Sequence, residues 1–159
     1  MPYIISGATH TRFDHALEAM EVARREAKVL KKKGRLPCPM NDIMLYTLIH
    51  DAGHGPLSHA FEYPAKEATG LTHNERALLI LDSPLPDMTG KTFADATRLA
   101  GGDVEFIRKL LKGHPASAIC KDKTLGADKL AYTSKDASYC GFDQLPPLTR
   151  QHLSLSHLL

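Results

Sequence analysis

Three histidines and two carboxylates fall within residues 48–62 of this chain, in the run Leu-Ile-His-Asp-Ala-Gly-His-Gly-Pro-Leu-Ser-His-Ala-Phe-Glu. Neutral imidazole and ionised carboxylate are ligands that borderline divalent metals prefer. The adjacent His50 and Asp51, leaving the end of an apolar helix, can point both side chains at one ion. The glycines that follow allow a tight backbone path, and the proline suits the first turn of a new helix. The run predicts a helix, a sharp turn and a second helix.

The helix expected before this turn, residues 43–51, is apolar nearly all round and should therefore be central and buried. Burying His50 and Asp51 at its end costs free energy unless their charges are compensated, and a metal ion would compensate them. This argument favours metal ligands over a hydrogen-bonded core histidine. Either Asn41 or Asp42 can cap the start of the helix.

A long helix is expected upstream, from about Thr11 to Lys33, with Gly34 at its end. Arg12 lies three residues before His15, hence on the same helical face, and can reach an anion held beside that histidine. Taken alone, a histidine near a helix start is more often a capping or surface residue.

Downstream of the turn we expect a short helix over about residues 56–63 and then a loop over residues 64–71. His59 and Glu62 are three residues apart on this helix, so an acid–base or orienting pair is available. For Glu62, a hydrogen bond that merely holds the helix is an equally weighted alternative.

Residues 72–75, Thr-His-Asn-Glu, predict a capping box that opens a helix through residue 81. The capping box does not require His73. This residue is therefore interpreted either as a pocket residue or as a surface histidine at a helix start. Further helices are expected over about residues 92–100 and from a cap at Asp103 through residue 111. A last helix places Asp128, Tyr132 and Asp136 on one stripe.

Taken together, these segments resemble the HD-domain superfamily of metal-dependent phosphohydrolases. The closest wording is that of the deoxynucleoside triphosphate triphosphohydrolase branch, with its R-F-x-H segment, H-D-x-G-H-G-P-x-S-H motif, T-H-E segment and D-x-D-R/K-x-x-Y-x-x-x-D helix. The chain departs from that branch at Glu62 and Gly126, where aspartate is usual, and at Asn74, where glutamate is usual.

The resemblance implies an all-α fold, a compact helical bundle of the HD type, and one HD domain over residues 1–159. It implies one divalent metal ion, held by His15, His50, Asp51 and Asp128. It implies catalytic positions at His54, His59, His73 and Glu62, and substrate contacts at Arg12, Lys129, Tyr132 and Asp136. Mixed nitrogen and oxygen ligands fit Mn, Fe, Co, Ni, Zn or Mg and do not choose among them.

The expected function is hydrolysis of a phosphate ester, of a nucleotide or similar small molecule, by water that the metal activates. A deoxynucleoside triphosphate triphosphohydrolase, an HD-type 5'-nucleotidase and a cyclic-nucleotide or alarmone hydrolase all stay open. Two other classes also stay open: a non-catalytic metal- or nucleotide-binding signalling module, and a structural helical domain. An enzyme is favoured because the histidines beyond the four ligands are not needed for metal binding.

Composition narrows the choice of partners and compartment. The formal charge of +2 over 159 residues is too small to indicate nucleic acid or a membrane surface as partner. No run has the roughly twenty apolar residues of a membrane span, and no signal peptide is visible, so a cytoplasmic location is expected. The cysteines, Cys38, Cys120 and Cys140, lack C-x-x-C spacing and suit a reducing compartment. A homo-oligomer stays open, because the chain ends on apolar residues.

Overall fold

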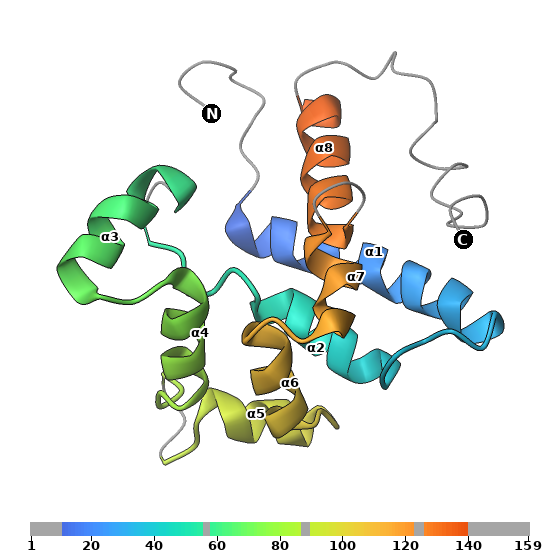
Figure 1. The fold of residues 1–159 in the computed structure, drawn as a ribbon, viewed down its shortest axis with the longest axis horizontal. Helices are drawn as coiled ribbons and strands as arrows, with labels where there is room; N and C mark the ends of the chain where they lie inside the picture. Colours follow the sequence, from blue (N-terminus) through green and yellow to red (C-terminus); the bar gives the residue numbers. More distant parts are fainter. Residues whose placement is uncertain (1–10, 56–57, 87–89, 123–125, 140–159) are drawn as a thin grey trace.

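The computed structural model describes residues 11–55, 58–86, 90–122 and 126–139, and it is helical throughout this part (Figure 1). Two short 3₁₀ turns, η1 and η2, stand among eight helices in these ranges. In chain order the elements are α1 (Arg12–Lys32), α2 (Met40–Ile49), η1 (Ser58–Phe61), α3 (Glu62–Thr69), α4 (His73–Leu81), α5 (Phe93–Leu99), α6 (Val104–Leu111), η2 (Pro115–Ser117), α7 (Ala118–Lys121) and α8 (Ala127–Tyr139). Apart from one isolated bridge between Pro84 and Thr92, no β-pairing occurs in these ranges. The predicted all-α class is confirmed.

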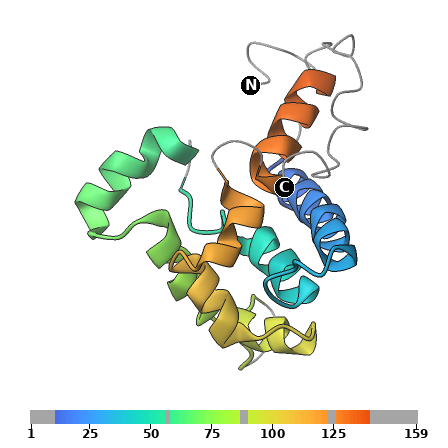
Figure 2. The same ribbon diagram turned by 45° about the vertical axis from the view of Figure 1, so that its right-hand side comes forward.

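Helix α1 is the longest of the described elements, and both α2 and α8 pack against it (Figures 1 and 2). On its other side α2 packs against α6, which in turn contacts α4 and α5. The short α7 contacts α1, α2 and α8, and so links the α1–α8 contact to α2. Helix α3 projects from the other helices in both views and packs mainly on η1.

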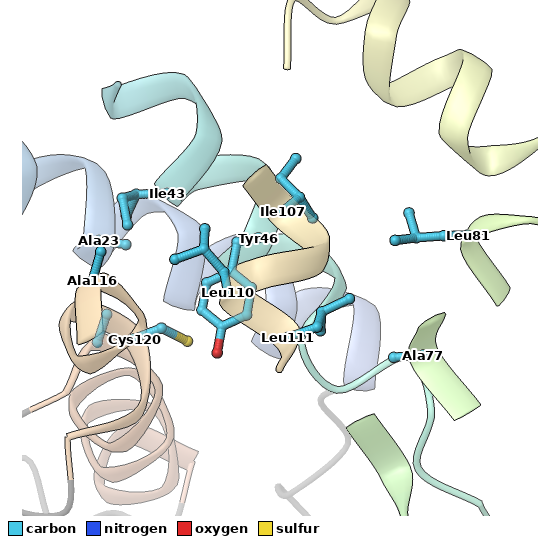
Figure 3. Close-up of a cluster of buried hydrophobic side chains, with 11 residues drawn as sticks. Ala23, Ile43, Tyr46, Ala77, Leu81, Ile107, Leu110, Leu111, Ala116 and Cys120 are labelled. Atoms are coloured by element: carbon cyan, nitrogen blue, oxygen red, sulfur yellow. The ribbon is translucent and has the colours of Figure 1, made fainter. Parts of the chain in front are cut away.

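The core lies between α2 and α6 (Figure 3). Its largest members are Ile43 and Tyr46 of α2, Ile107, Leu110 and Leu111 of α6, and Leu81 of α4, each no more than 2% exposed. Small residues of neighbouring helices complete the cluster and let the backbones approach closely; they include Ala23, Ala77 and Ala116. The expectation that the second helix is central is therefore confirmed.

Four helix starts lie where the sequence placed them. Thr11, Thr72 and Thr92 each accept a hydrogen bond from the backbone three residues on, in complete capping boxes, and Asp103 caps α6. The end of α1 before Gly34, whose φ is 67°, is confirmed as well.

The predicted cap of α2 is wrong. This helix begins at Met40 after Pro39, and no side chain caps it. The Asn41 side chain donates to the carbonyl oxygen of Ala100 instead, at 2.8 Å. The buried Asp42 carboxylate accepts from the backbone N–H of Asp103, also at 2.8 Å, and thereby ties α2 to the start of α6.

The predicted loop over residues 64–71 is also wrong, because α3 occupies most of it and ends at Gly70 in the left-handed conformation. Pro64 is the third residue of this helix, where a backbone N–H would have no partner within the helix, so proline is tolerated there. The short helix predicted over residues 56–63 is divided between η1 and the start of α3.

No helix among the described residues is both long enough and apolar enough to span a membrane. The expectations for the apolar C-terminal residues and for Cys140 lie outside the described ranges. The extent of the predicted single domain over residues 1–159 stays a prediction.

Candidate active site

The four predicted metal ligands converge from three helices. His15 comes from α1, His50 and Asp51 follow the end of α2, and Asp128 lies in the first turn of α8, so that ligand atoms of all four lie within 4.8 Å of one another. The Nε2 atom of His15 lies 2.8 Å from Asp128 Oδ1. The Nε2 atom of His50 lies 3.1 Å from Asp51 Oδ1 and 3.4 Å from Asp128 Oδ1. We refer to these residues as the His–Asp cluster.

The backbone turns that follow α2 shape this cluster. Ala52 N–H donates to the carbonyl oxygen of Ile49, and His54 N–H donates to that of Asp51. Gly53 then packs directly on the start of α4, where a Cβ atom would lie only 1.9 Å from the carbonyl oxygen of His73. Only glycine allows this approach, which brings the histidines of the turn and of α4 together.

The His–Asp cluster fits a cation. His50 is fully buried, and its Nδ1 lies 2.6 Å from the carbonyl oxygen of Thr47, so that Nδ1 carries the proton. Its Nε2 is buried and makes no hydrogen bond within the described part of the chain, although it faces both carboxylates. A neutral His50 would direct an Nε2 lone pair at two carboxylates, which is unfavourable unless a proton or a metal ion supplies positive charge there, and a divalent ion suits this donor set.

The electrostatics of the cluster agree with this conclusion. Burial lowers the pKa of His50, but Asp128, Cys120 and Asp51 outweigh it and raise that pKa to about 10. Conversely, burial raises the pKa of Asp128, but the hydrogen bond with His15 and the nearby His50 ring, 3.4 Å away, hold it well below its ordinary value. The cluster therefore keeps its carboxylates ionised and favours positive charge at its centre.

A second cluster lies beside the first, formed by His54, Glu62 and His73, whose ligand atoms also lie within 4.8 Å of one another. The His54 and His73 rings are stacked, with centroids 4.1 Å apart and an interplanar angle of 12°. His54 Nδ1 lies 3.7 Å from Glu62 Oε2, while its Nε2 lies 3.5 Å from Asp51 Oδ1. His54 thus connects the two clusters.

Glu62 is fixed by two hydrogen bonds. Its Oε1 accepts from the backbone N–H of His73 at 2.8 Å, and its Oε2 accepts from Arg76 at 2.6 Å. Although burial raises the pKa of Glu62, these bonds outweigh burial and lower it. The Glu62 carboxylate therefore holds α3 against α4 and also faces the rings of His54 and His73. It has the structural hydrogen bonds of one predicted alternative and the position of an orienting group of the other.

Two basic residues of this region were missed by the sequence reasoning. Arg76 also donates to the carbonyl oxygens of Gly53, at 2.8 Å, and Leu71, at 2.6 Å, so it holds the glycine turn against α4. Its position three residues after His73, on the same helical face, is a signal that could have indicated it. Lys121 belongs to the short α7, which the sequence analysis did not predict, and its ammonium group contacts His73.

A pocket of about 650 Å³ opens over the His–Asp cluster. Of the predicted substrate-binding residues it is lined by Arg12, Tyr132 and Asp136, and it also includes His54 and Ser58. Phe13 lies at the pocket too and is 67% exposed. Lys129 is exposed and does not line this pocket.

Arg12 reaches over the turn that follows α2. Its Nη2 atom donates to the carbonyl oxygen of Gly55 at 2.9 Å and to Ser58 Oγ at 2.5 Å. Ser58 itself has a φ of 50°, which is uncommon for a residue other than glycine. The backbone of His59 lies in η1, whereas its side chain is outside the description.

The structure therefore brings together the four predicted metal ligands and three of the four predicted catalytic residues. Their roles stay predictions.

Comparison with known proteins agrees with the fold and the site. A profile described as the HD domain matches residues 12–115. The chain is 30% identical over 140 residues to the uncharacterized protein YwfO of Bacillus subtilis, covering 85% of this chain and 30% of that protein. It is 30% identical over 129 residues to the deoxynucleoside triphosphate triphosphohydrolase SAMHD1 of Bos taurus, covering 74% of this chain and 21% of that protein.

Among solved structures, a phosphohydrolase from Bacteroides thetaiotaomicron superposes with a TM-score of 0.65 at 24% sequence identity, covering 89% of this chain and 33% of that one. The all-helical fold around a His–Asp cluster and the structural match place the chain in a class of helical domains that carry such a cluster. More particularly, the chain belongs to the HD-domain family, which confirms the resemblance found in the sequence. It spans about a third or less of the length of these relatives.

Proposed function

We propose that this chain hydrolyses a phosphate ester of a nucleotide or a similar small molecule, with one divalent ion held by His15, His50, Asp51 and Asp128. The observation that carries this proposal is the convergence of two imidazoles and two carboxylates beneath a pocket that also presents the Arg12 guanidinium. With four protein ligands, an ion of coordination number five or six keeps one or two positions for substrate and water, as a catalytic site requires. When bound, such an ion polarises a phosphate oxygen and lowers the pKa of water.

The residues around the cluster supply binding and proton handling. The Arg12 guanidinium has five N–H donors. Its hydrogen bonds to Gly55 and Ser58 both come from Nη2, so the N–H groups of Nε and Nη1 are placed to bind phosphate oxygens. Tyr132 and Asp136 follow Asp128 at one-turn intervals along α8, so a hydroxyl donor and a carboxylate acceptor face the pocket beyond the phosphate.

His54 is placed to hold or move a proton. It lies between Asp51, which it meets through Nε2, and Glu62, which it meets through Nδ1. A ring with a carboxylate on each side is oriented whichever nitrogen carries the proton, and it can accept a proton from water or donate one to a leaving oxygen. Glu62 orients His54, and His73 stacks against its ring.

A nucleotide is the substrate class that these observations support best. The volume of about 650 Å³ lies within the range of about 300–1,000 Å³ for small-molecule sites. Similarity to SAMHD1 supports a deoxynucleoside triphosphate in particular. The same metal ligands would serve hydrolysis of a 5'-nucleotide, a cyclic nucleotide or an alarmone, so these substrates remain alternatives.

The experiment is product analysis by anion chromatography after incubation with Mn and a panel of nucleoside mono-, di- and triphosphates. Tripolyphosphate would identify a triphosphohydrolase, and orthophosphate from a monophosphate would identify a nucleotidase. Asp51→Ala should abolish metal retention and turnover. Asp82→Ala, which removes a carboxylate paired with Arg108 outside the pocket, is the matched control and should retain both. Retention of both by Asp51→Ala would overturn the proposal, whereas bound metal without any product would favour a non-catalytic binding module.

A further inference from the structure

The ammonium group of Lys121 joins α7 to the start of α4. Its Nζ lies 3.1 Å from His73 Nε2 and 3.0 Å from the side-chain oxygen of Asn74. A lysine ammonium group carries three N–H donors and no acceptor. Both contacts are therefore hydrogen bonds that Lys121 donates, and both go to uncharged acceptors. It follows that His73 Nε2 accepts, and that the proton of the neutral ring lies on Nδ1.

The environment of Nδ1, at the opposite edge of the His73 ring, favours the same Nδ1–H tautomer. His73 Nδ1 lies 3.5 Å from Glu62 Oε1, the oxygen that already accepts from the His73 backbone N–H at 2.8 Å. A proton on Nδ1 is attracted to this carboxylate, whereas a lone pair there would be repelled by it. Residues of two different helices, α7 and α3, thus impose one tautomer on a ring of a third.

We propose that Lys121 is a positioning residue that fixes His73 as the Nδ1–H tautomer, stacked on His54. This inference rests on the proposed function in one respect: the orientation of the stacked His54 and His73 rings is taken to serve hydrolysis. The charged groups around His73 agree with it: Lys121 faces Nε2, Glu62 faces Nδ1, and His54 covers one face of the ring. Burial and then the Lys121 charge lower the pKa of His73, so the ring stays neutral.

The same contact explains why this second cluster need not hold a metal ion. A metal beside Glu62 would need a lone pair on His73 Nδ1, which the proposed tautomer does not offer. Lys121 and Arg76 already place two positive charges at the edges of the cluster, on His73 and on Glu62. A further cation would be repelled by both.

The tautomer can be measured without any turnover. In the full chain with histidine labelled by ¹⁵N and loaded with Zn, long-range ¹H–¹⁵N correlations report which ring nitrogen carries the proton. His73→Gln identifies the His73 signal by its loss. We expect the Nδ1–H form in the wild type and in Lys121→Arg, which keeps a donor. In Lys121→Met we expect the Nε2–H or protonated form, with the titration midpoint raised by about one pH unit. Lys28→Met, at an exposed lysine of α1, is the matched control.

Asn74→Asp provides a second variant should Lys121→Met fail to fold. A carboxylate there would neutralise the ammonium group without removing it, and we expect the midpoint of His73 to rise. The inference is overturned by an Nε2–H tautomer in the wild type, or by an unchanged midpoint in both Lys121→Met and Asn74→Asp.

Kinetics separate this inference from the proposed function. If the chain hydrolyses a phosphate ester, Lys121→Met should lower kcat by about tenfold or more with little change in KM, because the substrate pocket itself is untouched. Lys121→Arg should restore most of kcat. A wild-type chain with the Nδ1–H tautomer but without turnover would overturn the proposed function alone, whereas turnover with the Nε2–H tautomer would overturn only the role of Lys121.

Discussion

His15 and Asp128 are 113 positions apart in the sequence, yet His15 Nε2 lies 2.8 Å from Asp128 Oδ1. This contact joins the first and last described helices, which pack against one another (Figure 2). The His–Asp cluster is therefore complete only when α8 is docked on α1. Metal binding should consequently be linked to the folding of the whole helical arrangement.

We predict that a saturating divalent metal raises the melting temperature of the wild type. At a hundred times the dissociation constant the stabilisation is about 2.7 kcal/mol, which for a chain of this size corresponds to roughly 5–10 °C. Asp128→Asn keeps the shape of the side chain but removes its charge, and it should abolish the rise. Asp136→Asn, two turns further along α8, should retain it. Differential scanning fluorimetry with and without a chelator measures both, and an equal rise in the two variants would contradict this ligand assignment.

Gly53→Ala should destabilise the chain strongly. The added Cβ would meet the backbone of α4, 1.9 Å from the carbonyl oxygen of His73 and 2.6 Å from the amide nitrogen of Ala77, and backbone atoms cannot move aside as a side chain can. Overpacking of this kind costs about 3 kcal/mol or more. Gly34→Ala is the control: its φ is 67° but no atom lies within 4 Å, so only the left-handed strain of about 1 kcal/mol is expected. Urea unfolding compares the two.

Arg12→Gln should raise KM by about 10- to 100-fold, because a charge-assisted contact with a phosphate contributes about 1.5–3 kcal/mol. Arg12→Lys should recover only part of the loss, since an ammonium group cannot make the paired contacts of a guanidinium. Arg25→Gln removes an exposed arginine of the same helix and should leave KM unchanged. If Arg12→Gln lowered thermal stability but not substrate binding, the role of Arg12 would be to brace Gly55 and Ser58.

Local sequence signals were enough to predict much of this structure. The capping boxes at Thr11 and Thr72 and the cap at Asp103 were predictable because each depends on residues three positions apart. The His–Asp cluster was predictable because the resemblance supplied the pairing of His15 with Asp128, which no local pattern contains.

The remaining features depend on packing between distant segments. Asp42 caps nothing in its own helix because the start of α6, 61 residues later, uses its carboxylate. Lys121 reaches His73 only because the four-residue α7 packs between α1, α2 and α8, and so short a helix has too little periodicity to be read from sequence. A loop was predicted from residue 64 onward, whereas the first turn of α3 accommodates Pro64 and the helix continues.

Glu26 should make the stability of the chain fall as pH rises. This residue of α1 is 4% exposed, and its Oε1 makes no hydrogen bond within the described ranges. Burial, and then the charge of Asp122, raise its pKa from 4.5 to about 8. The folded chain thus binds this proton more tightly than the unfolded chain. The associated stability is fully present below pH 4.5 and is lost progressively as pH rises to about 8, by on the order of 1.4 kcal/mol per unit of pKa shift.

Glu26→Gln replaces the neutral carboxyl group by a neutral amide, so the fall in the free energy of unfolding between about pH 5 and 6.5 should largely disappear, and the variant should exceed the wild type in stability at pH 8. Above pH 6.5 a fall should remain, because the pKa of His50 is raised to about 10 and this group loses its own contribution there. Glu21→Gln is the opposite control, because the hydrogen bond from Arg24 lowers the pKa of Glu21 to about 2. Glu21 stabilises the chain above pH 4.5 and loses this effect as pH falls, so its substitution should lower the free energy of unfolding by a constant amount above pH 4.5 and change the slope of the profile only below it. Urea unfolding from pH 3 to 9 measures both profiles. A wild-type slope retained by Glu26→Gln between about pH 5 and 6.5 would assign the pH dependence there to another group.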